Sequence, residues 1–122
     1  MAINTHDLII EKMRSLLITQ GYKVRVNPAQ EKAYSVTGPG FQPGEKVTYY
    51  PDVYTYDDVK NEVTNIYEVE TSETITSEAA KQWKLYANGS AKLYLVVPKA
   101  DLDKTKQLVV SNSVKVANYY TY

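Results

Sequence analysis

Residues 51–70 read PDVYTYDDVKNEVTNIYEVE. β-branched and aromatic residues fill much of the segments 53–56 and 63–70, and such residues favour strands. The segment between them, 57–61, is mostly polar, which is typical of a turn. The stretch therefore predicts an antiparallel hairpin around which the other elements of the chain must pack.

The same hairpin is expected to bring carboxylates together. Glu68 and Glu70 are two residues apart in a strand, so they share one face while Val69 points to the other, towards the core. If the turn is symmetric about Lys60, Asp52 lies opposite Glu68 with its side chain ~5 Å away on that face. A turn centred half a residue away would place Asp52 on the other face. With the symmetric turn, three carboxylates converge and favour a divalent cation with oxygen ligands, Mg²⁺ or Mn²⁺.

Helices and strands are predicted on both sides of the hairpin. Residues 5–20 carry apolar side chains at helical spacing, with Thr5 as the N-cap, and residues 27–46 form a loop with several glycines and prolines. The other predicted elements are strands at 22–26, 47–50, 92–97 and 114–119, and helices at about 77–88 and 101–110. We expect one α/β domain over residues 1–122, with a mixed β-sheet flanked by helices.

Composition excludes several classes of protein. The chain has no cysteine, which excludes a disulfide scaffold, a cysteine zinc site, an iron–sulfur cluster and a thiol nucleophile. The one histidine, His6, falls within the apolar arc of the first predicted helix. We expect it to be a partly buried histidine with satisfied hydrogen bonds rather than a catalytic one.

The formal net charge is zero, but the charges are unevenly distributed. Residues 31–80 hold ten acids and three lysines, whereas residues 81–122 hold seven lysines and two acids. This balance excludes a generic polycation that coats DNA, yet it leaves basic flanks around an acidic centre. No apolar run approaches the ~20 residues that span a bilayer and no signal peptide is visible, so we expect a cytoplasmic protein with no membrane partner.

Two short motifs resemble those of a known family. A Pro-Asp pair at 51–52, followed by Glu-Val-Glu at 68–70, resembles the signature of the PD-(D/E)XK nuclease superfamily, which has the restriction-endonuclease-like fold. Gln-x-x-x-Tyr at 82–86 resembles a motif of its recombination-exonuclease branch. The predicted element order resembles the αβββαβ core of that fold plus a C-terminal αβ unit, and the resemblance covers residues 5–97.

The resemblance implies a metal-dependent nuclease that hydrolyses phosphodiester bonds in DNA. Asp52 and Glu68, with the backbone carbonyl of Val69, would hold one Mg²⁺ or Mn²⁺, which lowers the pKa of a bound water and stabilises charge on the phosphate. Glu70 would act as general base or as ligand of a second ion. Gln82 would position the water or a phosphate.

This sequence departs from the family at its motif lysine, because Glu70 occupies that position. Lys81 and Lys92 are candidates for a lysine that has moved, whereas helical spacing turns Lys84 ~160° from the motif glutamine. The family often adds an acid from the first helix, which makes Glu11 a candidate metal ligand. The alternative for that residue is an acid that only solvates the helix.

Residues of the basic flanks are expected to contact DNA phosphates, namely Lys23, Arg25, Lys81 and Lys92. A domain of this size has little room for a separate recognition module, so we expect a homodimer. Two other functions stay open. One is a catalytically inactive protein of the same fold that acts as a nucleic-acid-binding or assembly module. The other is a small structural protein whose acidic hairpin face is only solvated.

Overall fold

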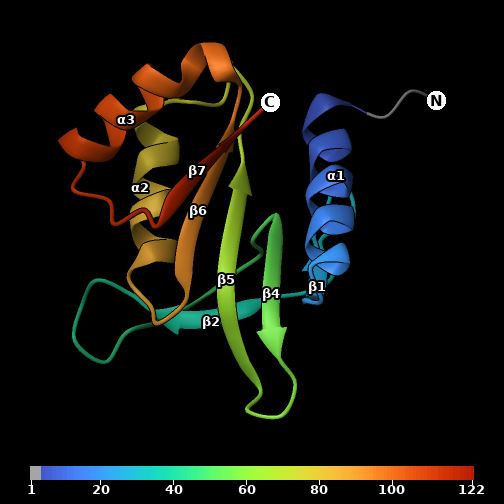
Figure 1. Cartoon of the computed structure of the whole chain (residues 1–122). Coiled ribbons are helices and arrows are strands. Elements are labelled where there is room, and N and C mark those ends of the chain that lie inside the picture. The colour runs from blue at the N-terminus through green and yellow to red at the C-terminus, as the bar shows by residue number, and fades with distance from the viewer. Residues whose placement is uncertain (1–3) are drawn as a thin grey trace.

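The computed structural model describes residues 4–122, and Figure 1 shows the course of the chain. After the first helix five strands follow one another, and from there helices alternate with strands. They are α1 (Thr5–Thr19), β1 (Lys23–Val26), β2 (Val36–Pro39), β3 (Lys46–Tyr49), β4 (Val53–Asp57), β5 (Glu62–Val69), α2 (Ser77–Ala87), β6 (Lys92–Val97), the 3-10 helix η1 (Lys99–Asp101), α3 (Leu102–Ser111) and β7 (Asn118–Thr121).

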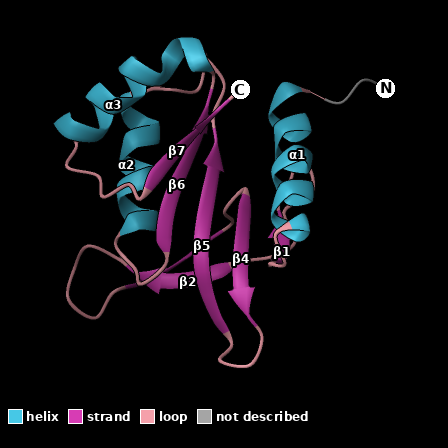
Figure 2. Ribbon diagram, in the orientation of Figure 1, coloured by secondary structure: helices cyan, strands magenta, loops and turns pink. Residues whose placement is uncertain are grey.

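Five of the strands form one mixed sheet in the order β1-β4-β5-β6-β7. The pairs β1–β4 and β4–β5 are antiparallel, and the pairs β5–β6 and β6–β7 are parallel. α1 packs on one face of this sheet, and α2 and α3 pack on the other (Figures 1 and 2). The predicted α/β class, with a mixed sheet flanked by helices, is confirmed.

The register of the β4–β5 hairpin sets the position of the acidic residues. Val53 pairs with Tyr67 and Thr55 with Asn65, which is the register of a turn symmetric about Lys60. Nearer the turn, Tyr56 pairs with Val63 and Asp57 with Glu62, so the turn is centred half a residue before Lys60 and the prediction of a symmetric turn is wrong. A bulge between Thr55 and Tyr56 restores the predicted register towards the other end of the hairpin. Continued one residue past Val53, this register brings residue 52 opposite residue 68.

Alternation along the strands divides the core into two layers. Side chains of one parity pack beneath α1, and those of the other parity pack beneath α2 and α3. Each fully buried large apolar side chain contributes roughly 1.5–3 kcal/mol to stability. The α1 layer includes Ile10, Met13, Leu17, Val53, Tyr67 and Val69, and the α2 layer includes Tyr54, Ile66, Trp83, Tyr86, Leu93 and Leu95.

The strands β2 and β3 form a separate two-stranded antiparallel sheet in which Val36 lies opposite Tyr49. The prediction of an uninterrupted loop over 27–46 is therefore wrong at 36–39, and the predicted strand at 47–50 pairs here instead of joining the main sheet. Both Val36 and Tyr49 are buried in the α2 layer, so burial of this pair holds the hairpin over that face. Pro51, which has no N–H to donate, separates β3 from β4.

Two element ends also differ from the prediction. Asn4 rather than Thr5 is the N-cap of α1, and its side-chain oxygen accepts a hydrogen bond from the Asp7 N–H at 2.8 Å. The last strand is 118–121 rather than 114–119, because Val114 follows the turn after α3 and packs into the core. Within residues 4–122, no helix combines the length and the apolar character needed to cross a membrane.

Candidate active site

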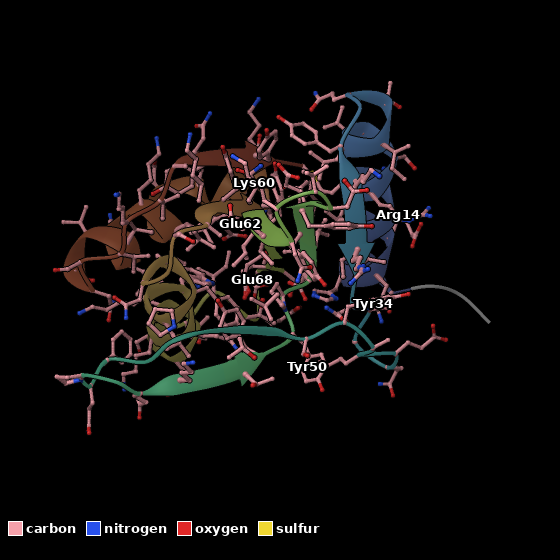
Figure 3. All side chains as sticks on the ribbon, turned by 90° about the horizontal axis from the view of Figure 1, so that it is seen from below. Arg14, Tyr34, Tyr50, Lys60, Glu62 and Glu68 are labelled. Carbon is pink, nitrogen blue, oxygen red and sulfur yellow. The ribbon has the colours of Figure 1, made fainter. Side chains whose placement is uncertain are left out.

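Three carboxylates meet where β4 begins and β5 ends. Asp52 directly precedes β4, Glu68 is the second-last residue of β5, and Glu70 directly follows that strand. Glu68 is 5% exposed and Glu70 is 7% exposed, which is rare for acidic residues without a cationic partner. Figure 3 shows Glu68 in the interior of the molecule, whereas Arg14 and Tyr50 lie at its surface.

Backbone hydrogen bonds fix two of these carboxylates to each other's strand. The Asp52 N–H donates to Glu68 Oε2 at 2.8 Å, and the Val69 N–H donates to Asp52 Oδ2 at 2.8 Å. The main-chain pairing of β4 with β5 ends at Val53, and beyond it these two side-chain hydrogen bonds join the strands. In a strand the carbonyl of a residue points to the same neighbour as its N–H, so the Val69 carbonyl also faces the Asp52 side.

His6 of α1 is the third element of this arrangement. Its Nε2 lies 3.1 Å from Asp52 Oδ1, and its Nδ1 lies 2.9 Å from Asp7 Oδ1. The hydrogen bond to Asp52 is the main cause that raises the pKa of His6 to about 9, so the ring is an imidazolium at neutral pH. The expectation of a partly buried histidine with satisfied hydrogen bonds is confirmed.

The α1 residue that reaches the carboxylates is therefore His6 and not Glu11. Glu11 is exposed, and its Oε2 lies 3.8 Å from Arg14 Nη1 on the outer surface of the helix. His6 precedes Ile10 by four residues and Met13 by seven, so it lies on the face of α1 that packs against the sheet. Its place in the apolar arc is the signal by which the sequence indicates this contact.

Burial and mutual repulsion change the acidity of Glu68 and Glu70. Burial, followed by the charge of Asp52, raises the pKa of Glu68 well above its usual range. The same two causes raise the pKa of Glu70 to about 8. The indole N–H of Trp83 lies near enough to Glu70 to oppose this shift, yet within the described residues this buried N–H has no hydrogen-bond partner. A polar ligand atom or water beside Glu70 would satisfy it.

Two stacked tyrosines close the site on the α2 side. The rings of Tyr49 and Tyr86 lie 4.2 Å apart between centroids, at an interplanar angle of 19°. Burial raises the pKa of both phenols, and the charge of Glu68 beside them adds to the effect. Both tyrosines are therefore neutral at ordinary pH and form a wall against Glu68.

The predicted residues of α2 point in different directions. Tyr86 is buried at 3% exposure beside Glu68, whereas Gln82, one turn earlier, is exposed. Lys81 is also exposed, and its Nζ lies 3.3 Å from Glu78 Oε1. The structure thus brings the tyrosine of the Gln-x-x-x-Tyr motif to the carboxylates and leaves the glutamine in solvent.

Three predicted DNA-contacting residues lie on β1 and β6, and two of them, Lys23 and Lys92, lie away from the carboxylates. Lys23 pairs with Asp58, and the Arg25 guanidinium lies 4.6 Å from the centre of the Tyr56 ring. The register places Lys23 beside residue 56 and Lys92 beside residue 65, three or more positions from the acidic end, whereas Arg25 lies beside residue 54, two positions from Asp52. At ~3.3 Å per residue, Lys23 and Lys92 are roughly 10 Å or more from that end along the strands.

A pocket of about 530 Å³ opens from solvent onto Asp52, the one carboxylate of the three that lines it. Asp52 and His6 form part of its wall, together with Thr71, Glu73 and Thr74 from the segment that follows β5. Lys32 lines the same pocket from the loop after β1. Sequence reasoning did not assign a role to Lys32, because its approach to Asp52 depends on how that loop folds.

Asn27 determines how the loop after β1 folds. This residue is fully buried, its amide nitrogen donates to the carbonyls of Tyr34 and Pro51, and its Oδ1 accepts the N–H groups of Ala33 and Tyr34. These four hydrogen bonds, of 2.7–3.0 Å, join the loop to the residue immediately before Asp52. Nothing in the local sequence besides a polar residue before Pro28 indicates this role.

The donor set at this site suits a divalent cation. The carboxylates of Asp52 and Glu68 and the carbonyl of Val69 are hard oxygen donors of the kind that Mg²⁺ and Mn²⁺ prefer. Clustered, buried acids with raised pKa values bind a cation in exchange for protons. Within residues 4–122, no three acidic or histidine residues are already arranged around one ion position, and an ion at Asp52 would compete with His6.

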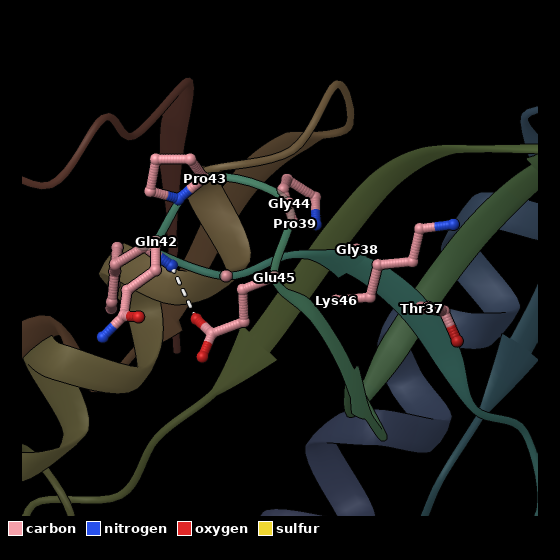
Figure 4. Close-up of a pocket in the computed structure, with 10 residues that line it drawn as sticks. Thr37, Gly38, Pro39, Gln42, Pro43, Gly44, Glu45 and Lys46 are labelled. Carbon is pink, nitrogen blue, oxygen red and sulfur yellow. Dashed lines mark hydrogen bonds between the residues drawn. The ribbon is translucent and has the colours of Figure 1, made fainter.

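A second pocket, of about 680 Å³, lies at the loop between β2 and β3 (Figure 4). Its lining, residues 37–46, contains one acid and one lysine, Glu45 and Lys46. Glu45 Oε1 accepts a hydrogen bond from the Phe41 N–H at 3.0 Å, and a β-carbon at Gly40 would collide with this side chain. The carboxylate of Glu45 therefore serves to shape the loop, and the acidic end of the main sheet is the stronger candidate site.

No known protein family, no curated protein and no solved structure matches this chain. The geometry of the described residues is therefore the basis on which a function is inferred.

Proposed function

We propose that this protein is a metal-dependent nuclease of the PD-(D/E)XK type that hydrolyses phosphodiester bonds in DNA. The observation that carries the proposal is that hydrogen bonds hold Asp52 and Glu68 next to each other at one end of a mixed sheet, with Glu70 buried beside them. The order of elements around them, α1-β1-β4-β5-α2-β6, follows the αβββαβ arrangement, with the β2–β3 hairpin inserted before β4.

The chain's own residues have distinct roles in this proposal. Asp52, Glu68 and the Val69 carbonyl would hold the divalent ion, which would supply an activated water and stabilise charge on the phosphate. Glu70, beside the Trp83 N–H, would accept a proton from the water once it is ionised, or would hold a second ion. Gln82 is too exposed to be assigned a role in positioning.

A cleavage assay tests the proposal. Wild-type protein is incubated with duplex, single-stranded, flapped and junction DNA in Mg²⁺, in Mn²⁺ and in EDTA. We expect metal-dependent cleavage that Asp52→Asn and Glu68→Gln reduce by at least about a hundredfold. Glu62→Gln, an exposed change on the same strand, serves as the matched control and should leave the rate unchanged. Failure of the wild type to cleave any of the four substrates in either metal would overturn the proposal.

A second candidate function is a catalytically inactive module of the same fold that binds nucleic acid. The specific observation in its favour is that backbone N–H groups and His6 already satisfy Asp52 and Glu68 without an ion. The same assay separates the two functions, because DNA binding without cleavage, unchanged by Glu68→Gln, is the result that an inactive module predicts.

We also propose that the protein acts on DNA as a homodimer, because one chain of 122 residues offers a small contact surface. Light scattering of the purified protein tests this directly. A mass of two chains is expected, and a single-chain mass at micromolar concentration would contradict the dimer.

A further inference from the structure

Lys32 stands out among the basic residues because of where the loop after β1 places it. It lines the pocket that opens onto Asp52 and His6, while the remainder of that wall includes the acid Glu73. Asn27 accepts the N–H groups of Ala33 and Tyr34, at 3.0 and 2.8 Å, directly after Lys32. The fully buried Asn27 thus fixes the backbone that presents Lys32 to the pocket.

The charge of Lys32 is available to a ligand. Lys23 and Lys81 are each paired with an acid, and His6 lies between two carboxylates. Across residues 4–122, no carboxylate oxygen lies within ion-pair distance of Lys32. Its positive charge nevertheless acts on Glu68, since it opposes the rise in the pKa of that residue.

An anion that approaches this pocket meets two acids in its wall, Asp52 and Glu73. A phosphodiester carries a negative charge, so these two carboxylates repel it unless a cation compensates, and the positive charge of His6 is already shared between Asp52 and Asp7. A lysine ammonium on a flexible stem at the pocket mouth has the donors and the reach to accompany a phosphate into the site. Glu70 cannot attract a phosphate in this way, because a carboxyl group is anionic or neutral but never cationic.

We propose that Lys32 contacts a non-bridging oxygen of the DNA phosphate that enters this pocket and provides the positive charge that residue 70 lacks. This inference rests on the proposed nuclease function, since it assumes that the bound phosphodiester is the one to be cleaved. It assigns a substrate contact to the loop after β1.

Binding and cleavage of a fluorescent single-stranded oligonucleotide by Lys32→Gln, Lys32→Arg and Lys60→Gln test the inference. Lys60 is an exposed lysine on the hairpin turn and is the matched control (Figure 3). Binding is measured in EDTA at several salt concentrations, and cleavage is measured in Mg²⁺ or Mn²⁺. Lys32→Gln should weaken binding about tenfold and lower the salt slope by about 0.7, whereas Lys32→Arg and Lys60→Gln retain both.

Each outcome separates this inference from the proposed function. Cleavage that Asp52→Asn abolishes, with Lys32→Gln and Lys60→Gln indistinguishable in binding and rate, overturns the role of Lys32 and leaves the nuclease intact. Binding that weakens only in Lys32→Gln, without cleavage by the wild type, supports the phosphate contact and overturns the nuclease. A wild type that neither binds this oligonucleotide nor cleaves any of the four DNA substrates overturns both.

Discussion

Replacing Glu70 by glutamine should change how the stability of the protein depends on pH. Burial, with the nearby charge of Asp52, raises the pKa of Glu70 from 4.5 to about 8 in the folded protein. The folded state therefore holds this proton more tightly than the unfolded state does. The resulting stabilisation is complete below about pH 4.5 and is lost as the pH rises to about 8.

The magnitude follows from the two pKa values. Each pKa unit corresponds to about 1.36 kcal/mol, so the full shift amounts to roughly 5 kcal/mol, of which roughly 3.5 kcal/mol falls between pH 5 and pH 8. Glutamine has the size of glutamate but does not ionise, so residue 70 no longer makes the free energy of unfolding fall as the pH rises. His6, whose pKa is about 9, also loses stabilisation above pH 6.5, but it is present in both proteins.

The assay is urea unfolding of metal-free protein in EDTA at pH 5, 6.5 and 8. We expect the free energy of unfolding of Glu70→Gln to rise relative to the wild type by roughly 3 kcal/mol from pH 5 to pH 8. Glu73→Gln, an exposed acid of the pocket wall, should show the wild-type profile. If the difference between Glu70→Gln and the wild type is the same at pH 5 and pH 8, the reasoning about the buried carboxylate is refuted.

Two further substitutions test the supports of the site, and both are measured by urea unfolding. Asn27→Asp should destabilise the fold by about 3 kcal/mol, because a carboxylate cannot donate to the Pro51 carbonyl, and a loss below about 0.5 kcal/mol would contradict this role. Tyr122→Phe should cost about 1–2 kcal/mol, because the Tyr122 hydroxyl donates to the Glu70 carbonyl at 2.5 Å and Pro98 has no N–H to replace it. Unchanged stability of this variant would show that water satisfies the carbonyl.

The shared face of Glu68 and Glu70 was predictable, because side chains alternate along any strand. The turn itself is centred half a residue before Lys60, which alone would place Asp52 on the other face. The bulge between Thr55 and Tyr56 adds the missing residue and brings Asp52 opposite Glu68, and no local pattern in the sequence indicates that bulge.

The contributions from the helices were harder to predict, because helical spacing gives relative directions but not the partner of each face. On α2, burial of Trp83 and Tyr86 turns Gln82 into solvent. On α1, the face that carries the buried residues directs His6 to Asp52, and the exposed Glu11 stays with Arg14.

The loop after β1 could not be predicted at all beyond its turn residues. The position of Lys32 depends on Asn27, whose hydrogen bonds reach Tyr34 and Pro51, seven and 24 residues away. These contacts depend on the pairing of β1 with β4, which places Asn27 next to the residues that precede β4. No pattern in the sequence records them.

The most direct test of the central claim is calorimetric titration of Mn²⁺ or Mg²⁺ into the metal-free protein. The proposed site predicts binding of about one ion per chain with release of protons, because the ion replaces them on Glu68 and Glu70. Asp52→Asn should abolish this binding, and Glu62→Gln should retain it. Absence of metal-dependent heat in the wild type, or binding that persists in Asp52→Asn, would contradict a metal site at these carboxylates.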